Sequence, residues 1–133
     1  MLPRILIVDD ESSICISLSL ALEPEYEVIW ETDPIRALER LQTEPIDLVL
    51  LDMVMPKLNG FGVLSVMNQN HWIDSVPVIM ISAESDSVYV ERAYQLGVTD
   101  YIGRPFDKAV IRQRVINTLM LYAKQKHLMR MVT

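Results

Sequence analysis

Residues 47–56, DLVLLDMVMP, contain the pattern from which the fold of this chain can be predicted. An aliphatic run without alternation predicts a β-strand buried on both faces, as in a parallel sheet covered by helices. The run ends at Asp52, and Pro56 then stops the strand. Residues 5–11, ILIVDDE, repeat the arrangement, with Asp9 and Asp10 after the aliphatic run. The two segments therefore predict a parallel sheet with carboxylates at the carboxyl ends of its strands.

Short apolar runs alternate with helical patterns along the whole chain. The predicted strands are residues 5–8, 27–30, 47–51, 77–81 and 101–102. The predicted helices begin near residues 12–13, 34, 60, 85 and 107, and Gly97 closes the fourth. In the second helix, Ile35, Leu38 and Leu41 are expected to face inward. This order predicts an α/β fold: a flavodoxin-like, doubly wound, five-stranded parallel sheet with five helices.

Composition excludes several classes of protein. A chain of 133 residues, 50% of them hydrophobic, suffices for one domain with its own core. The net charge of −6 argues against direct, non-specific nucleic-acid binding. Cys15 is the only cysteine, so no intrachain disulfide can form, and its apolar neighbours predict a buried thiol. No apolar run approaches the roughly twenty residues of a membrane span, and no signal peptide is recognisable, so a cytoplasmic location is expected.

The last predicted helix is long. Residues 107–133 contain neither glycine nor proline, whereas about a dozen residues would cover one edge of the sheet. A weak heptad pattern runs through it, at Ile111, Val115, Thr118, Tyr122, Gln125, Met129 and Val132. We therefore divide the chain into a domain, residues 1–121, and an extension of the last helix, residues 122–133. A frayed tail and a signalling helix leading to a partner protomer or an effector domain both remain open interpretations.

Acidic, hydroxyl and cationic side chains follow four of the predicted strands. These residues are Asp9, Asp10, Asp52, Ser82 and Arg104. Each alone has a structural explanation as a turn, a cap or a surface charge, but ligands bind beyond the carboxyl ends of parallel strands. Clustered carboxylates need a cation to stay ionised, and an oxygen-only set suits Mg²⁺ or Mn²⁺. One such carboxylate can then attack phosphorus and form an aspartyl phosphate.

Four segments, in order and at family-like spacing, resemble the receiver domains of two-component response regulators, the CheY-like superfamily. They are ILIVDDE at residues 5–11, DLVLLDMVMP at 47–56 followed by Gly60, PVIMISA at 77–83, and DYIGRPFD at 100–107. The resemblance extends from about residue 4 to residue 121. It implies the same fold and a role in two-component signal transduction.

The resemblance also implies a role for individual residues. The metal ligands that it implies are Asp9, Asp10, Asp52 and the backbone carbonyl of Val54. Asp52 would be the phosphoacceptor, Ser82 would contact the phosphoryl group, and Ser82 and Tyr101 would act as the switch. Pro105 would follow a cis peptide bond.

Arg104 departs from the family pattern, because receivers normally have lysine before this proline. Arginine keeps the positive charge and can bind phosphate through two N–H groups, but it is longer and planar. Phosphorylation is expected to persist, with an altered rate or coupling to the switch. A docking module that works without phosphorylation is the alternative that Arg104 favours. A phosphohydrolase or flavin carrier is disfavoured, because the first strand has neither an Asp-x-Asp pair nor a glycine-rich phosphate loop.

The resemblance implies partners as well. A sensor histidine kinase or a phosphotransfer protein would donate the phosphoryl group, and the domain would catalyse only its own phosphorylation and dephosphorylation. The switch would change the face formed by the fourth helix, the last strand and the last helix. Its expected exposed residues are Tyr89, Arg92, Gln95 and Lys108. A homodimer through that face or the last helix, an effector domain at the C-terminus and a stand-alone regulator all remain open interpretations.

Overall fold

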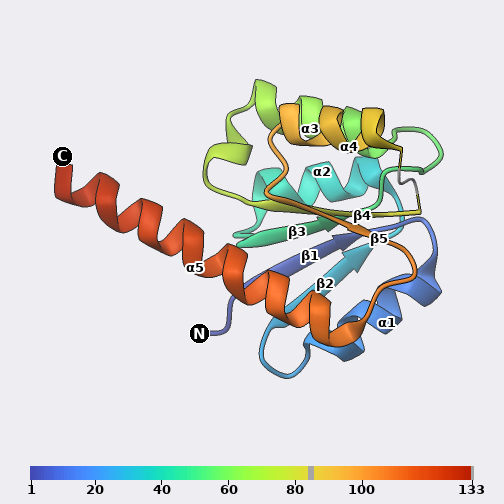
Figure 1. Ribbon diagram of the computed structural model, residues 1–133, viewed down its shortest axis with the longest axis horizontal. Coiled ribbons are helices and arrows are strands. Elements are labelled where there is room, and N and C mark those ends of the chain that lie inside the picture. Colours follow the sequence, from blue (N-terminus) through green and yellow to red (C-terminus); the bar gives the residue numbers. More distant parts are fainter. Residues whose placement is uncertain (84–85, 133) are drawn as a thin grey trace.

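The computed structural model describes residues 1–83 and 86–132 (Figure 1). Its strands are β1 (Arg4–Val8), β2 (Glu27–Glu31), β3 (Leu48–Leu51), β4 (Val78–Ser82) and β5 (Asp100–Gly103). Its helices are α1 (Ser12–Leu22), α2 (Pro34–Thr43), α3 (Gly60–Gln69), α4 (Ser87–Gln95) and α5 (Lys108–Val132), with a 3-10 turn, η1 (Trp72–Asp74).

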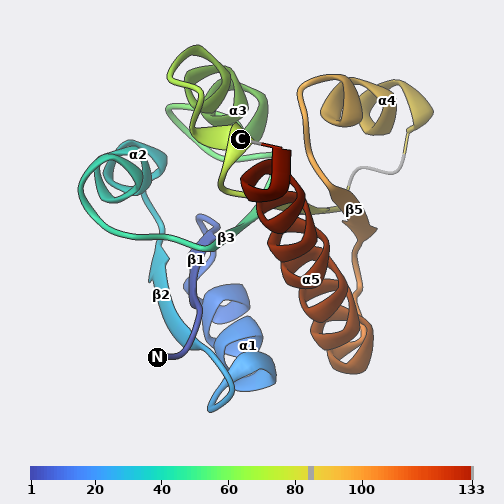
Figure 2. The same ribbon diagram turned by 90° about the vertical axis from the view of Figure 1, so that its left-hand side faces the viewer.

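The strands form one parallel sheet in the order β2-β1-β3-β4-β5. Helices α2, α3 and α4 cover one face of the sheet, and α1 and α5 cover the other (Figure 2). The predicted doubly wound α/β fold is confirmed. The chain leaves β1 toward one face of the sheet and leaves β3 toward the other. The loops that follow these two strands therefore separate and open a crevice at the carboxyl ends, where such folds bind ligands.

The aliphatic runs of the central strands supply two cores, one on each face. In β1, Leu6 and Val8 pack toward α2, α3 and α4, while Ile5 and Ile7 pack toward α1 and α5. All four side chains are buried, which accounts for the absence of a polar alternation in the sequence. Burial of each such side chain stabilises the fold by roughly 1.5–3 kcal/mol.

Short polar side chains mark where most helices begin. Asp33 accepts a hydrogen bond from the backbone N–H of Ile35 at 2.9 Å, and Pro34 occupies the first turn of α2. Such caps contribute about 1 kcal/mol each. The corresponding caps of α3, α4 and α5 are Asn59, Asp86 and Asp107. The starts predicted at residues 34 and 60 are confirmed, whereas the start predicted at residue 85 lies outside the described residues.

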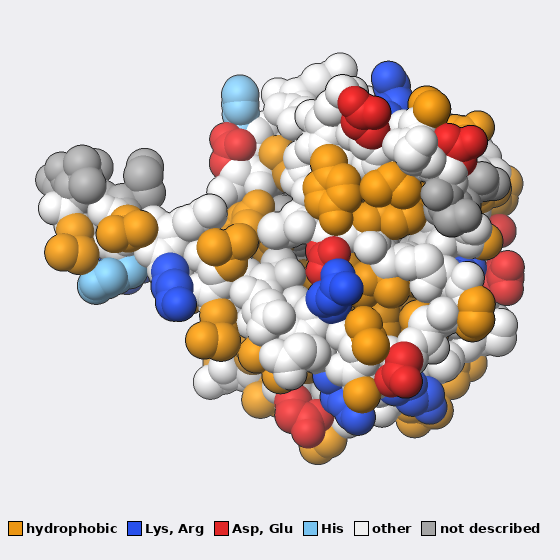
Figure 3. Space-filling view, in the orientation of Figure 1, with side chains coloured by type: hydrophobic (Ala, Val, Ile, Leu, Met, Phe, Trp, Pro, Cys, Tyr) orange, Lys and Arg blue, Asp and Glu red, His pale blue; other side chains and the backbone are white. Residues whose placement is uncertain are grey.

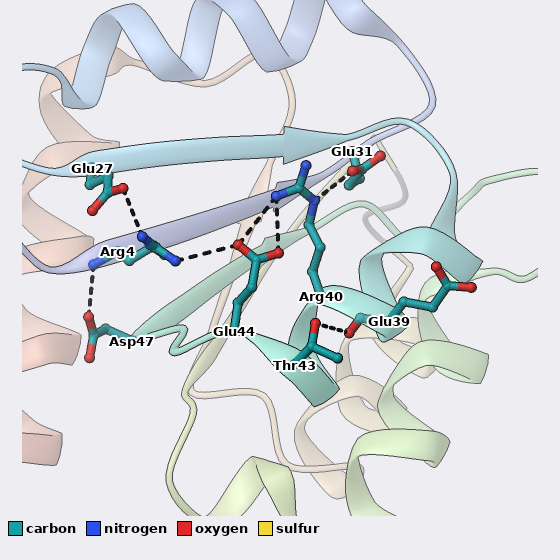
Figure 4. A network of polar contacts seen from close by, with 8 residues as sticks. All are labelled: Arg4, Glu27, Glu31, Glu39, Arg40, Thr43, Glu44 and Asp47. Carbon is teal, nitrogen blue, oxygen red and sulfur yellow. Dashed lines mark hydrogen bonds and ion pairs between the residues drawn. The ribbon is translucent and has the colours of Figure 1, made fainter.

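Ion pairs tie α2 and Glu44, the residue after it, to the amino end of β1 and to the carboxyl end of β2 (Figure 4). The Arg4 guanidinium reaches Glu27 at 2.9 Å and Glu44 at 3.4 Å. Arg40 pairs with Glu31 at 2.6 Å and with Glu44 at 3.2 Å. Partly exposed pairs contribute at most about 1 kcal/mol each, so their main effect is to orient α2 on the edge of the sheet.

Three details differ from the sequence-based predictions. The turn η1 was not expected. Ile35 is 45% exposed, so the prediction that it faces inward is wrong, although Leu38 and Leu41 do pack against the core. Its helix lies over the edge strand β2, where little sheet surface remains to cover it. The first residues of the predicted heptad, Ile111, Val115 and Thr118, are buried in this domain and therefore do not form a free stripe.

The end of α5 projects past the amino ends of the strands, on the side opposite the carboxyl ends (Figure 1). Lys124, Gln125, Lys126, His127 and Leu128 are all exposed. Helix α5 therefore continues beyond the sheet to Val132. In residues 1–83 and 86–132, every helix is too short or too polar to span a membrane.

Candidate functional site

The acidic residues predicted from the strand ends meet at the crevice between β1 and β3. One carboxylate oxygen from each of Asp9, Asp10 and Asp52 lies within 4.8 Å of the others. Asp9 is 2% exposed and Asp52 is 6% exposed, whereas Asp10 faces solvent. The cluster therefore has two buried carboxylates and one exposed carboxylate, and it can be reached from solvent on the side of Asp10.

Backbone pairing holds the two buried aspartates in place. The N–H of Asp52 donates to the carbonyl of Val8 at 2.9 Å, which extends the pairing of β1 with β3 by one step. The carboxylate of Asp9 accepts a hydrogen bond from the backbone N–H of Glu11 at 3.0 Å, just before α1. Neighbouring parallel strands thus bring together residues that lie more than forty positions apart in the sequence.

Burial raises the proton affinity of both buried carboxylates. Burial, followed by the negative charge of Asp9, raises the pKa of the Asp52 carboxyl from 3.8 to about 7, and Arg104 offsets part of this. Burial also raises the pKa of Asp9. A cluster that resists full ionisation needs positive charge nearby. Its donors are all oxygens and one side is open, so the site fits Mg²⁺ or Mn²⁺, which bind few carboxylates and retain water.

Arg104 supplies one positive charge to this cluster. Its Nη2 contacts a carboxylate oxygen of Asp9 closely and lies 3.4 Å from Oδ1 of Asp52. Its backbone N–H donates to the carbonyl of Ser82 at 3.0 Å, which holds the loop after β5 beside the end of β4. Within the described chain, the buried Nε of Arg104 has no hydrogen-bond acceptor. The guanidinium therefore points into the site and not toward solvent.

The remaining predicted residues lie at or near the same edge of the sheet. Ser82 is buried at the end of β4, and Tyr101 of β5 is half-buried and packs against the core between the sheet and α2, α3 and α4. The side chain of Val54 is exposed in the loop after β3. The Arg104–Pro105 peptide bond is cis, and a second cis bond precedes Pro24.

Sequence reasoning missed three contributions to this site. The thiol of Cys15 donates to the backbone carbonyl of Asp9 at 3.5 Å, and burial raises the pKa of this thiol to about 12. Gly60 lies against the backbone of Asp52. Lys57 adopts a left-handed conformation with φ of 70° and reaches Asp33 at 3.2 Å, which links the loop after β3 to α2. Only Gly60 had a sequence signal, because it was quoted together with the motif at residues 47–56.

Comparison with known proteins identifies the family. The response regulator receiver domain model matches residues 5–116, so the chain belongs to this family. It is a receiver domain of a two-component response regulator. Response regulator RR06 of Streptococcus pneumoniae serotype 2 is 36% identical over 113 residues, which are 84% of this chain and 51% of that protein.

Two further relatives are informative. The alkaline phosphatase synthesis transcriptional regulatory protein PhoP of Bacillus subtilis is 35% identical over 113 residues, which are 84% of this chain and 46% of that protein. The crystal structure of a CheY-like response regulator receiver domain protein from Methanospirillum hungatei JF-1 superimposes with a TM-score of 0.87. It has 25% sequence identity, and the match covers 94% of this chain and 99% of that one. The chain spans about half the length of the two curated relatives.

Proposed function

We propose that this receiver domain is a phosphorylation switch whose phosphoacceptor is Asp52. The main observation in support is the cluster itself: two buried carboxylates and an exposed one within 4.8 Å, at the ligand end of the sheet and beside a cation. A buried carboxylate of this kind has no role in core packing. The donor would be the phosphohistidine of a sensor histidine kinase or a phosphotransfer protein.

Asp9, Asp10 and Asp52, with the backbone carbonyl of Val54, would hold one Mg²⁺ or Mn²⁺ ion. When bound, the ion supplies the positive charge that keeps Asp52 ionised and neutralises the oxygens of the incoming phosphoryl group. The exposed position of Asp10 leaves that side of the cluster accessible from solvent.

In the transfer, a carboxylate oxygen of Asp52 attacks phosphorus. A P–O bond forms as the P–N bond to the donor histidine breaks, and the electron pair of that bond remains on the imidazole. The Arg104 guanidinium, 3.4 Å from Asp52, is placed to neutralise a phosphoryl oxygen. The hydroxyl of Ser82, at the end of the adjacent strand β4, would donate to another. The domain would catalyse only this transfer and the later hydrolysis.

The output would pass through the face formed by α4, β5 and α5. Figure 3 shows this face, where apolar side chains gather over α4 and along α5 around a few charged ones. Arg114 of α5 binds Asp100 of β5 through two hydrogen bonds of 2.6 and 2.7 Å. Movement of Ser82 and Tyr101 toward the phosphorylated site would shift α4 relative to this fixed pair.

The four residues expected on that face are all exposed, but they do not all belong to it. Gln95 and Lys108 remain candidates for partner contacts. The ring of Tyr89 stacks on the ring of Phe61 in α3, with 6.3 Å between the ring centroids. The guanidinium carbon of Arg92 lies 5.6 Å from the centroid of the Phe61 ring. Tyr89 and Arg92 are therefore on the α3 side of α4.

The proposed domain covers residues 1–121, with residues 122–133 as the extension of α5. Tyr122 is at the boundary, because its hydroxyl still donates to the carbonyl of Ile73 at 3.4 Å. The extension would connect the domain to an effector domain or to a second protomer. The relatives support an effector domain, since this chain spans about half of their length.

Mass spectrometry after incubation with acetyl phosphate and Mg²⁺ tests the proposal. We expect the wild type to gain one phosphoryl group and Asp52→Asn to gain none. Asp47→Asn is the matched control, because Asp47 is an exposed aspartate just before the same strand, at its opposite end. If Asp52→Asn is labelled as readily as Asp47→Asn, Asp52 is not the acceptor. If neither the wild type nor Asp47→Asn is labelled, the domain works without phosphorylation.

A further inference from the structure

We propose that Arg104 competes with the divalent metal ion for the carboxylate of Asp9, so that this arginine sets the metal affinity of the domain. The inference rests on the proposed function, because it takes the acidic cluster to be the metal site. It concerns the one position at which this chain departs from the family pattern.

The contacts of Asp9 are the first reason. One carboxylate oxygen accepts the backbone N–H of Glu11 at 3.0 Å, and the other is in close contact with Nη2 of Arg104. Both oxygens are therefore engaged by donors of this chain. A metal ion that binds Asp9 has to share an oxygen with one of these donors or displace it, and the arginine side chain is the one that can move.

Burial is the second reason. The Arg104 side chain is 17% exposed and that of Asp9 is 2% exposed, so water and salt screen the pair weakly. A divalent cation among the three aspartates would also lie close to the guanidinium and be repelled by it. Both effects lower the affinity for the metal.

The third reason is that the displaced guanidinium has another partner available. Nη2 is already 3.4 Å from Asp52, and the buried Nε has no acceptor within the described chain. A phosphoryl group on Asp52 would offer the oxygen acceptors that Nε lacks, in a geometry suited to the guanidinium fork. The Arg104 guanidinium would thus leave Asp9 and bind the phosphoryl group on Asp52. Metal binding to Asp9 would favour this change of partner.

Isothermal titration of the full chain with Mg²⁺ tests the competition, without phosphorylation as a readout. We expect Arg104→Gln to bind Mg²⁺ with a dissociation constant roughly tenfold lower than that of the wild type. Arg104→Lys keeps the charge but is shorter, so we expect a smaller increase in affinity. Arg112→Gln removes the same charge from an exposed position on α5 and should bind as the wild type does.

A second measurement follows the arginine directly. In a ¹⁵N spectrum, the Nε–H signal of Arg104, assigned from its loss in Arg104→Lys, should shift with Mg²⁺ at the concentrations that saturate the calorimetric signal. If this signal does not change with Mg²⁺, the guanidinium stays in place and the inference is wrong. Circular dichroism confirms folding, and if Arg104→Gln does not fold, Arg104→Lys and the spectrum decide the question.

The outcomes separate this inference from the proposed function. If the wild type binds Mg²⁺ and Arg104→Gln binds it equally or more weakly, Arg104 assists the metal and the inference is wrong, while the phosphorylation proposal stands. If no variant binds Mg²⁺, both are wrong. If Arg104→Gln and Arg112→Gln gain the same affinity for Mg²⁺, the gain comes from the change in net charge alone. That result would also overturn the inference.

Discussion

Gly60, the first residue of α3, lies directly against the backbone of Asp52. A Cβ atom at position 60 would be 2.6 Å from the carbonyl oxygen of Asp52 and 2.9 Å from Cα of Met53. The N–H of Gly60 also donates to the carbonyl of Met53 at 2.7 Å. Only glycine allows the start of α3 to approach this closely, so the helix holds the backbone on which the proposed phosphoacceptor stands.

We expect Gly60→Ala to destabilise the domain by about 1–3 kcal/mol, because the added methyl group meets backbone atoms and no rotamer relieves the contact. Phosphorylation by acetyl phosphate should also slow, since the backbone of Asp52 must shift. Gly103→Ala is the control, because a Cβ at position 103 meets no atom within 4 Å. Urea titration of both variants checks this, and equal stabilities would contradict the close approach.

Asp52 should also make stability depend on pH when Mg²⁺ is absent. Burial and the charge of Asp9 raise its pKa from 3.8 to about 7 in the folded domain, so the folded state binds this proton more tightly than the unfolded chain. The free energy of unfolding therefore falls as pH rises from about 4 to about 7, and the loss is complete above that range. We expect this group to lower the stability at pH 8, relative to pH 5, by roughly 2–4 kcal/mol.

Asp52→Asn isolates this contribution, because its amide cannot ionise. The variant should lose less stability than the wild type between pH 5 and pH 8, and should be the more stable protein at pH 8 in urea titrations. Added Mg²⁺ should stabilise the wild type at pH 8 by mass action and Asp52→Asn less. Parallel pH profiles for the two proteins would show that Asp52 does not carry a raised pKa.

The acidic site could be predicted because its residues are defined locally. Each aliphatic run indicates a strand, and the residue after it must lie at the carboxyl end, as Asp9 and Asp52 do. Parallel pairing then brings them together without further information. The proximity of Gly60 to Asp52 could not be read in the same way, because it depends on how α3 packs against the loop after β3.

The last helix shows a different limit. Its heptad spacing was compatible with packing against a second helix or against the chain's own sheet, since both need one apolar face. The structure places Ile111 and Val115 in the core below the sheet, so the first half of the pattern serves the domain. The same ambiguity explains Ile35, which has helical spacing but lies at the sheet edge and is 45% exposed.

Cys15 should be unreactive in the folded domain. Burial raises the pKa of its thiol from 9.0 to about 12, so the thiolate that reacts is scarce at neutral pH. The side chain is also fully buried in α1, with its Sγ donating to the carbonyl of Asp9. We expect no labelling by a thiol-reactive disulfide at pH 8 over minutes, and complete labelling in urea. Rapid labelling of the native protein would mean that α1 opens away from the acidic site.

Truncation of α5 should show where the domain ends. Removal of residues 124–133 takes away no buried side chain among the described residues, so we expect the free energy of unfolding to change by less than about 0.5 kcal/mol. Removal of residues 118–133 also deletes buried Thr118 and half-buried Leu119 and Tyr122, and should cost about 2–5 kcal/mol. Urea titration of the two truncations provides the comparison. A large loss from the shorter deletion would place the extension within the folded domain, because exposed helical residues contribute little to a core that they do not touch.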